Sequence, residues 1–184
     1  MFGLLHSLMA SPGCKRYMET LMGRRAKYHR LLYSIFALLS LGAVVIWQFS
    51  ISSFYLASFP ILKYVIMLIL GVPGLVLMII CIRKYFYRFS GVKVFFEIKN
   101  EAKLESTGVY AIVRHPLYLG TLAVLWSIFL YFPLLSNLLA CVSITAYTLI
   151  GLRLEEQKLL KAFGGQYVAY RRRTPMIIPN FPLR

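Results

Sequence analysis

One short stretch of this sequence could bind an anion. Residues 108–120 have the sequence GVYAIVRHPLYLG, in which Arg114 and His115 directly precede Pro116. Proline is favoured at the first position of a helix, so a helix is predicted to begin at Pro116. The free N–H groups of such a helix start bind carboxylates and phosphates, and Arg114 and His115 would add donors there. The alternative is an ordinary helix start at a membrane interface, where these residue types are common.

The adjacent pair Glu155-Glu156 could instead hold a cation. The chain has only six acidic residues, and this is their only adjacent pair. With about 100° of rotation per residue, the pair flanks the apolar face of a predicted helix. Carboxylates beside an apolar face are costly unless they are paired or bind a cation. The alternative is a salt bridge to a nearby arginine such as Arg153 or Arg114.

Composition places both stretches in a membrane protein. Of the 184 residues, 59% are hydrophobic and only 15% are charged, whereas about 25% are charged in a typical soluble domain. Between Arg30 and Arg83 the only charged residue is Lys63, and such long apolar runs are typical of transmembrane helices. A net charge of +15 would suit nucleic-acid binding in a soluble domain. In a chain this apolar, we expect no nucleic-acid partner.

The apolar runs predict four membrane-spanning segments. Residues 31–82 contain two of them, at 31–50 and 59–82. Residues 116–152 are uncharged and too long for one crossing, because a helix rises about 1.5 Å per residue and the hydrocarbon core is about 30 Å thick. The sequence PLLSN at 133–137 supplies a turn, so we expect a transmembrane hairpin there.

The basic residues orient these predicted spans. With four spans, segments 1–30, 83–115 and 153–184 share one side and carry every Lys and Arg except Lys63. The positive-inside rule then places both termini and any polar active site in the cytoplasm. We expect one membrane domain, 1–184, in which these segments are an interfacial N-terminal segment, a cytoplasmic connector and a helical tail. The fold class is all-α, an integral membrane protein with about four transmembrane helices and a C-terminal helical hairpin.

Smaller signals refine this topology. Pro73 and Gly74 fall inside the second span and are expected to kink it. Residues 14–30 place apolar side chains at helical spacing among basic residues, which predicts an amphipathic helix on an anionic membrane surface. Gly120 would let a ligand or a neighbouring helix approach closely. The three cysteines form neither a CxxC motif nor a metal-ligand spacing.

The order of these motifs resembles a known enzyme family. The sequence TGVYAIVRHPLYLG, an uncharged hairpin and then EEQKLLKAFGGQYVAYRRRTP resemble the isoprenylcysteine carboxyl methyltransferase family over roughly residues 100–176. Its wider superfamily includes phospholipid N-methyltransferases, NnrU-type membrane proteins and methanethiol S-methyltransferases. The resemblance implies a membrane methyltransferase without a Rossmann domain. It also implies that S-adenosylmethionine is held between the hairpin and the cytoplasmic tail, 153–184, which would cover this cofactor.

The resemblance also assigns cofactor-binding residues by position. Glu155 would receive the cationic amino-acid end of S-adenosylmethionine, with Glu156 beside it. The full expected set is Lys103, Leu104, Tyr110, His115, Pro116, Leu117, Tyr118, Glu155 and Glu156. No metal is expected.

Candidate catalytic residues are Arg114, His115 and Arg153. A thiol or amine acceptor must lose a proton, for which His115 or a glutamate could serve. In the isoprenylcysteine enzymes an arginine one turn before the glutamates meets the substrate carboxylate. The corresponding residue here is Gly151, with Arg153 only nearby, and this difference argues against an isoprenylcysteine carboxylate as the acceptor.

The functional prediction is therefore an S-adenosylmethionine-dependent membrane methyltransferase. The acceptor would be lipidic, or a small thiol, carboxylate or amine, and membrane lipids would be further partners. The expected location is a bacterial inner membrane. The alternative is a non-catalytic NnrU-type accessory protein that keeps the fold. A channel or transporter is disfavoured because ionisable residues are nearly absent from the predicted mid-membrane positions.

Overall fold

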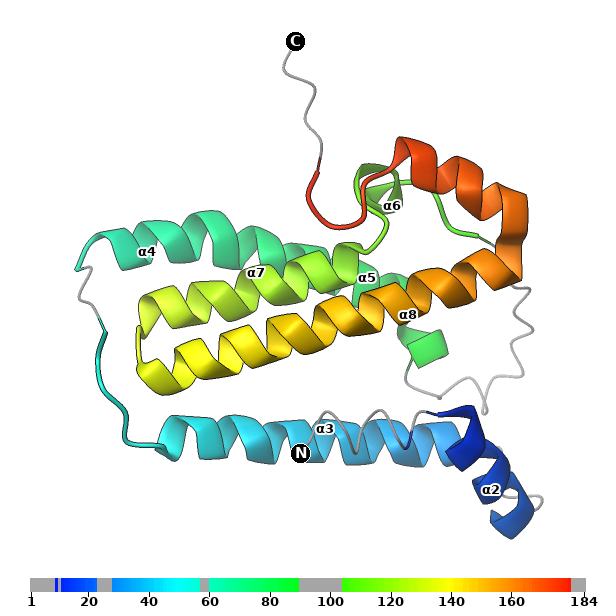
Figure 1. Cartoon of the computed structure of the whole chain (residues 1–184). Coiled ribbons are helices and arrows are strands. Elements are labelled where there is room, and N and C mark those ends of the chain that lie inside the picture. Colours follow the sequence, from blue (N-terminus) through cyan, green and yellow to red (C-terminus); the bar gives the residue numbers. More distant parts are fainter. Residues whose placement is uncertain (1–8, 10, 23–27, 57–59, 90–103, 180–184) are drawn as a thin grey trace. The chain divides into compact units, whose positions relative to one another are not determined.

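The computed structural model describes residues 9, 11–22, 28–56, 60–89 and 104–179. Every regular element in these ranges is a helix, and no β-strand is formed there (Figure 1). The helices are α2 (Pro12–Met22), α3 (His29–Ser50), α4 (Leu62–Ile66), the π-helix η2 (Met67–Gly71), α5 (Val72–Phe89), α6 (Val109–Ile112), α7 (Pro116–Tyr131) and α8 (Leu135–Arg173). The predicted all-α class is confirmed for this part of the chain.

The chain divides into two compact units, residues 1–52 with 84–100, and residues 53–83 with 101–184. The first unit contains α2 and α3. Helix α3 contains the predicted first span, and none of the residues of its apolar stretch is buried within the protein, as expected for a helix surrounded by lipid. Helix α2 covers part of the predicted amphipathic helix, whereas residues 1–8 and 23–27 lie outside the described residues.

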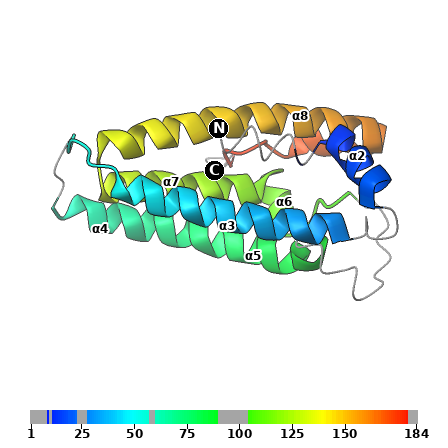
Figure 2. The same ribbon diagram turned by 90° about the horizontal axis from the view of Figure 1, so that it is seen from below.

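The second unit contains α7 between two helical neighbours. The α4–η2–α5 helix runs along one side of α7 and α8 along the other (Figures 1 and 2). The π-helix η2 ends just before Pro73, where a kink was predicted. Proline has no N–H group and its ring crowds the preceding turn, so a locally widened turn accommodates it without ending the helix.

Three described helices are long and apolar enough to cross a membrane, at Leu31–Ser50, Leu62–Lys84 and Leu135–Arg173. Helix α7 has 16 residues, which corresponds to a length of about 24 Å, less than the hydrocarbon core of about 30 Å. A fourth crossing therefore stays a prediction. Helix α8 has 39 residues and continues past residue 152, where the predicted hairpin ends.

Small residues let α7 approach the α4–η2–α5 helix closely. A Cβ atom added to Gly120 would lie 2.7 Å from the carbonyl oxygen of Gly74, and one added to Gly71 would lie 2.8 Å from Oγ of Ser127. Both distances are shorter than real Cβ contacts. Gly120 therefore allows a neighbouring helix to approach closely, which is one of its two predicted roles. Its lack of a side chain sets the distance between α7 and the α4–η2–α5 helix.

The turn between α7 and α8 pairs with the segment that precedes α4. Leu56 N–H donates to the carbonyl of Pro133 at 2.8 Å, and Leu135 N–H donates to the carbonyl of Phe54 at 3.0 Å. These bonds satisfy backbone groups that a turn would otherwise leave unpaired. They hold the turn between α7 and α8 against the segment that precedes α4.

Lys63 lies at this same end of the second unit. Its Nζ is 5.0 Å from the ring centroid of Tyr64 and 5.2 Å from that of Tyr131. Such cation–π contacts contribute about 0.5–1 kcal/mol at exposed sites. They explain how one cation is accommodated in an otherwise apolar stretch.

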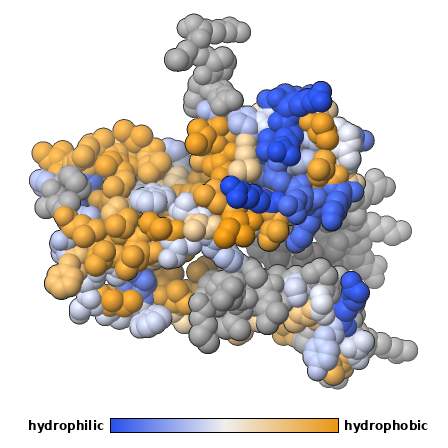
Figure 3. Space-filling view, viewed as in Figure 1, coloured by the Kyte–Doolittle hydropathy of each residue, from blue (hydrophilic) through white to orange (hydrophobic). Residues whose placement is uncertain are grey.

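Helix α8 changes character along its length. The space-filling view shows apolar residues over α7 and the first part of α8, and hydrophilic residues over the last part of α8 (Figure 3). At Gly164 the backbone adopts φ 51° and ψ −125°, a conformation that glycine adopts at little cost. The chain bends there, as the Gly164-Gly165 sequence suggests, and the final turns are redirected towards α6 and the start of α7 (Figure 1).

Candidate functional site

Glu156 is the centre of a buried polar cluster. Its carboxylate accepts hydrogen bonds from Arg114 Nε at 3.0 Å and Arg114 Nη2 at 2.9 Å. His115 Nε2 lies 2.8 Å from Oε1 of Glu156, and the Tyr167 hydroxyl donates to the same oxygen. The exposed fractions of Glu156, Arg114 and His115 are 8%, 9% and 5%. We call Arg114, His115, Glu156 and Tyr167 the polar clasp.

The clasp favours the ionised form of Glu156. Burial alone would raise the pKa of this carboxyl group, but hydrogen bonds from Arg114, Tyr167 and His115 outweigh burial and lower the pKa to about 2. Burial, together with the hydrogen bond to Glu156, raises the pKa of Tyr167, so this residue stays a hydroxyl donor. A buried ion pair with several further hydrogen bonds is the arrangement in which a charge is tolerated away from water.

The clasp also fixes the chain after α8. Arg114 Nη1 donates to the carbonyl of Thr174 at 2.5 Å. The backbone N–H groups of Arg114 and His115 donate to the carbonyls of Pro175 at 2.9 Å and Met176 at 3.1 Å. We call residues 174–178 the strap. The residues at the predicted anion-binding mouth, Arg114 and His115, thus bind this chain's own strap and Glu156.

Glu155 has different surroundings from its neighbour. The Tyr118 hydroxyl donates to Oε2 of Glu155 at 3.0 Å, and Glu155 is half-buried. In the part of the chain that the structure describes, no ion pair to Glu155 is found. Arg153, the arginine nearest in sequence, is exposed. The half-buried carboxylate therefore has one hydroxyl donor and no cationic partner among the described residues, so it could accept hydrogen bonds from a positively charged ligand group.

The start of α7 lies close to this carboxylate. His115 is the residue before the helix, and its side chain makes no capping hydrogen bond to the first turn. Tyr118 lies in that first turn, with its ring centroid 5.8 Å from that of His115. A helix start without a side-chain cap offers N–H groups to an acceptor such as a carboxylate. Glu155 could therefore accept hydrogen bonds from an ammonium group, and the N–H groups in the first turn of α7 could donate to a carboxylate. The hydrogen bond from Tyr118 to Glu155 brings these two features together.

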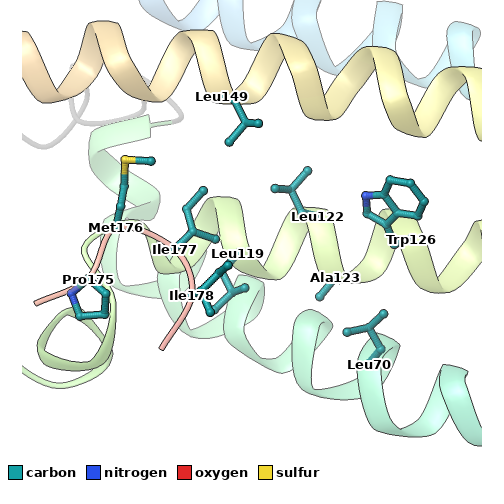
Figure 4. Close-up of a pocket in the computed structure, with 10 residues that line it drawn as sticks. All are labelled: Leu70, Leu119, Leu122, Ala123, Trp126, Leu149, Pro175, Met176, Ile177 and Ile178. Atoms are coloured by element: carbon teal, nitrogen blue, oxygen red, sulfur yellow. The ribbon is translucent and has the colours of Figure 1, made fainter. Parts of the chain in front are cut away.

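An apolar cavity of about 670 Å³ is lined by ten residues of η2, α7, α8 and the strap (Figure 4). One wall is a row on α7 with helical spacing, at residues 119, 122, 123 and 126. Leu149 of α8 and Leu70 of η2 form further walls, and residues 175–178 of the strap line one end. The Trp126 indole N–H donates to Oγ1 of Thr145 at 3.1 Å, which fixes this side chain between α7 and α8.

The other predicted site residues are placed as follows. Tyr110 lies in α6, and its carbonyl accepts a hydrogen bond from the Tyr170 hydroxyl at 2.6 Å. Pro116 is buried, whereas Leu104 and Leu117 are half-buried. Lys103 lies outside the described residues. The strap and the cavity were not predicted, although the spacing of apolar residues 119, 122, 123 and 126 on a helix indicates one continuous face.

Comparison with known proteins identifies the family. The sequence profile of the family described as "Phospholipid methyltransferase" matches residues 62–166, more than half of the chain. A methanethiol S-methyltransferase of Crocosphaera subtropica is 30% identical over 187 residues, which cover 97% of this chain and 71% of that protein. The chain therefore belongs to the phospholipid methyltransferase family, and the predicted membrane methyltransferase superfamily is confirmed.

Two further relatives align over shorter regions. Methanethiol S-methyltransferase 2 of Bradyrhizobium diazoefficiens is 36% identical over 101 residues, 54% of this chain and 36% of that protein. The methanethiol S-methyltransferase of Pseudomonas deceptionensis is 32% identical over 114 residues, 58% of this chain and 42% of that protein. The chain thus spans only about a third of the first of these relatives. No solved structure matches the chain.

Proposed function

We propose that this protein is an S-adenosylmethionine-dependent membrane methyltransferase whose acceptor is a small thiol. The observation that carries the proposal is the contrast at Glu155, a half-buried carboxylate with one hydroxyl donor and no cationic partner among the described residues. Family membership supports methyl transfer, and the names of the relatives support a thiol acceptor. They give no support to the non-catalytic accessory alternative.

The residues present fit the proposed cofactor. Glu155 would accept hydrogen bonds from its ammonium group, and the uncapped start of α7 at Leu117 and Tyr118 would donate to its carboxylate. When bound, S-adenosylmethionine would supply a methyl group on a sulfonium centre; a C–S bond to the thiol sulfur would form as the C–S bond to the sulfonium breaks, with a neutral thioether as the leaving group. Glu156 and Pro116 would support this site from behind, because both are buried.

The chain must also take up the proton that the thiol loses. His115 is the proposed acceptor. Its Nε2 faces Oε1 of Glu156 at 2.8 Å, so the ring proton is expected on Nε2 and Nδ1 is the remaining acceptor. A carboxylate that fixes the tautomer of a histidine and stabilises its protonated form is a common way to orient a base. Arg114 would act by holding Glu156 in this position, and the exposed Arg153 is proposed only to contact a substrate from the surface.

The proposed orientation places this site in the cytoplasm. The described end of α8 carries Arg171, Arg172 and Arg173 in its last turn, on the same end of the second unit as the start of α7 (Figure 1). Basic residues concentrate on the cytoplasmic side of membrane proteins. A bacterial inner membrane, with both termini in the cytoplasm, is the location that we propose.

The test uses the purified full chain in detergent with methyl-labelled S-adenosylmethionine. Acceptors would be methanethiol, phosphatidylethanolamine and a prenylated cysteine, with Glu105→Gln as a matched control for Glu155→Gln. We expect label in the methylated thiol, much less in the other two products, and loss of transfer in Glu155→Gln only. Absence of cofactor binding at millimolar concentration by well-folded protein would contradict the enzyme, and label in the phospholipid alone would contradict the thiol acceptor.

A further inference from the structure

The apolar cavity has a wall that does not belong to the helical bundle. Its other walls are side chains of α7, α8 and η2, whereas one end is lined by the strap, including Met176 and Ile177 (Figure 4). The strap follows the end of α8 and contains no regular helix. The size of the cavity therefore depends on where the strap lies as well as on how the helices pack.

The position of the strap is set by the polar clasp. The carbonyls of Thr174, Pro175 and Met176 accept hydrogen bonds from Arg114 and His115, and Arg114 is itself held by Glu156. The backbone of the strap is bound on the clasp side, while its side chains at 176 and 177 face the cavity (Figure 4). In this wall the backbone is held by hydrogen bonds, whereas the apolar side chains could be substituted without breaking those bonds.

The volume of the cavity is larger than the smallest thiol requires. Cavities that hold small organic ligands typically measure about 300–1,000 Å³, and this one measures about 670 Å³. Methanethiol has a single carbon, so it would leave most of the space unfilled. The ten side chains that line the cavity are apolar apart from the indole of Trp126, and that indole N–H is already bonded to Thr145.

We propose that this cavity binds the alkyl group of the thiol acceptor, and that Met176 and Ile177 of the strap limit the size of the alkyl group accepted. The inference rests on the proposed function, because Met176, which lines the cavity, accepts a hydrogen bond from the backbone N–H of His115, the proposed proton acceptor. The alkyl group would lie against residues 119, 122 and 126 of α7. Its recognition would come from shape and burial of apolar surface.

The first measurement is kcat/KM for a series of straight-chain alkanethiols, from methanethiol upwards. Each CH2 group buried in the cavity is expected to raise kcat/KM by about 3- to 4-fold until the cavity is full, after which the values fall. Ile177→Ala should move this maximum to longer chains. Leu122→Trp, which fills the cavity, should move it to shorter ones. Ile150→Ala is the matched control, because Ile150 is 61% exposed on α8 and does not line the cavity.

The second measurement is independent of turnover. An alkyl sulfide that carries a diazirine would be photo-crosslinked to the purified protein, and a phospholipid with a diazirine in its acyl chain would be used in a parallel sample in vesicles. We expect the sulfide to label peptides containing residues 119–126 or 175–178, in competition with alkanethiols. Labelling of these peptides by the phospholipid, without competition from alkanethiols, would overturn the inference in favour of a lipid chain in the cavity.

The two measurements separate the inference from the proposed function. Methyl transfer that shows no dependence on chain length, with an unchanged maximum in Ile177→Ala, would overturn the inference while the proposed function stands. Competitive labelling of the cavity by the sulfide without any methyl transfer would overturn the proposed function while supporting alkyl binding at this site.

Discussion

The polar clasp and the apolar cavity both use side chains of α8 and both contact the strap, but they differ in how their groups are satisfied. In the clasp, Glu156 is bonded to Arg114, His115 and Tyr167, and these groups satisfy one another. In the cavity, apolar side chains face open space (Figure 4). The clasp therefore fixes structure, whereas the cavity has room for a ligand.

The neighbouring residues Glu155 and Glu156 show the same contrast. Glu156 belongs to the clasp and is ion-paired with Arg114. Glu155 lies outside the clasp and accepts a hydrogen bond from Tyr118. The charge of Glu156 is therefore used to hold the fold, while the charge of Glu155 is the one that we assign to ligand binding.

Breaking the clasp should have the largest effect on stability. Glu156→Gln keeps the shape of the side chain but leaves the buried guanidinium of Arg114 without a counter-charge. We expect the free energy of unfolding to fall by about 3–5 kcal/mol, measured by denaturant titration of the detergent-solubilised protein. Glu105→Gln, whose carboxylate accepts an exposed hydrogen bond from Thr107, should change it by less than about 0.5 kcal/mol. Equal stabilities of the two variants would show that the clasp does not hold the fold.

Disturbing the contact between α7 and the α4–η2–α5 helix should have the next largest effect on stability. In Gly120→Ala the new Cβ would lie 2.7 Å from the carbonyl oxygen of Gly74, so the helices must separate, and we expect a loss of about 1–3 kcal/mol. Gly151→Ala is the matched control, because a Cβ there meets nothing within 4 Å and alanine favours a helix by up to about 1 kcal/mol. Thermal unfolding should therefore shift in opposite directions for the two variants, and a shift in the same direction would contradict this packing.

Removing the Tyr118 hydroxyl that donates to Glu155 should have a smaller effect, on the binding of the cofactor. In Tyr118→Phe the carboxylate loses the hydrogen bond that positions it. We expect the dissociation constant of S-adenosylmethionine to rise by about 2- to 10-fold, with thermal stability nearly unchanged. Tyr55→Phe, at the opposite end of the second unit, should bind as the unmodified protein does. A Tyr118→Phe protein with unaltered affinity would remove Tyr118 from the site.

Mild acid should have the smallest effect on the free energy of unfolding. Because the pKa of Glu156 is lowered from about 4.5 to about 2, its contribution to stability is complete above about pH 4.5 and is lost as the pH falls through about 2. From pH 7 to about pH 5 this contribution should stay constant, and a partial loss should begin near about pH 4. The Glu156→Gln protein should lack this part of the pH dependence, and an identical acid profile in both proteins would contradict the assignment.

Much of the helical scaffold follows from local sequence. Pro116 begins α7, and Pro133, the first residue of the PLLSN sequence, lies in the connection between α7 and α8, because proline acts through its own backbone geometry. Residues 135–137 of that sequence already belong to α8, so the turn is shorter than predicted. The continuation of α8 past residue 152 also has a local cause, since no glycine or proline interrupts residues 152–163. The change from apolar to polar residues near residue 152 reflects a change in the surroundings of the helix and does not end it.

The site was only partly predictable because its contacts are long-range. The sequence placed Glu155 and Glu156 together at a cofactor, with an ion pair to Arg114 or Arg153 as the alternative. The structure pairs Glu156 with Arg114, 42 positions away, and leaves Arg153 exposed. Adjacent residues on a helix point about 100° apart, so the two carboxylates meet different neighbours. Which neighbours these are depends on how the strap crosses the start of α7, and no local pattern encodes that.

The most direct test of the division between the two glutamates is calorimetric titration of S-adenosylmethionine into the purified protein and into Glu155→Gln. We predict that Glu155→Gln unfolds at the same temperature as the unmodified protein but binds the cofactor about 10- to 100-fold more weakly, as expected for loss of a hydrogen bond to a charged group. An unchanged dissociation constant in a fully folded Glu155→Gln protein would contradict this prediction.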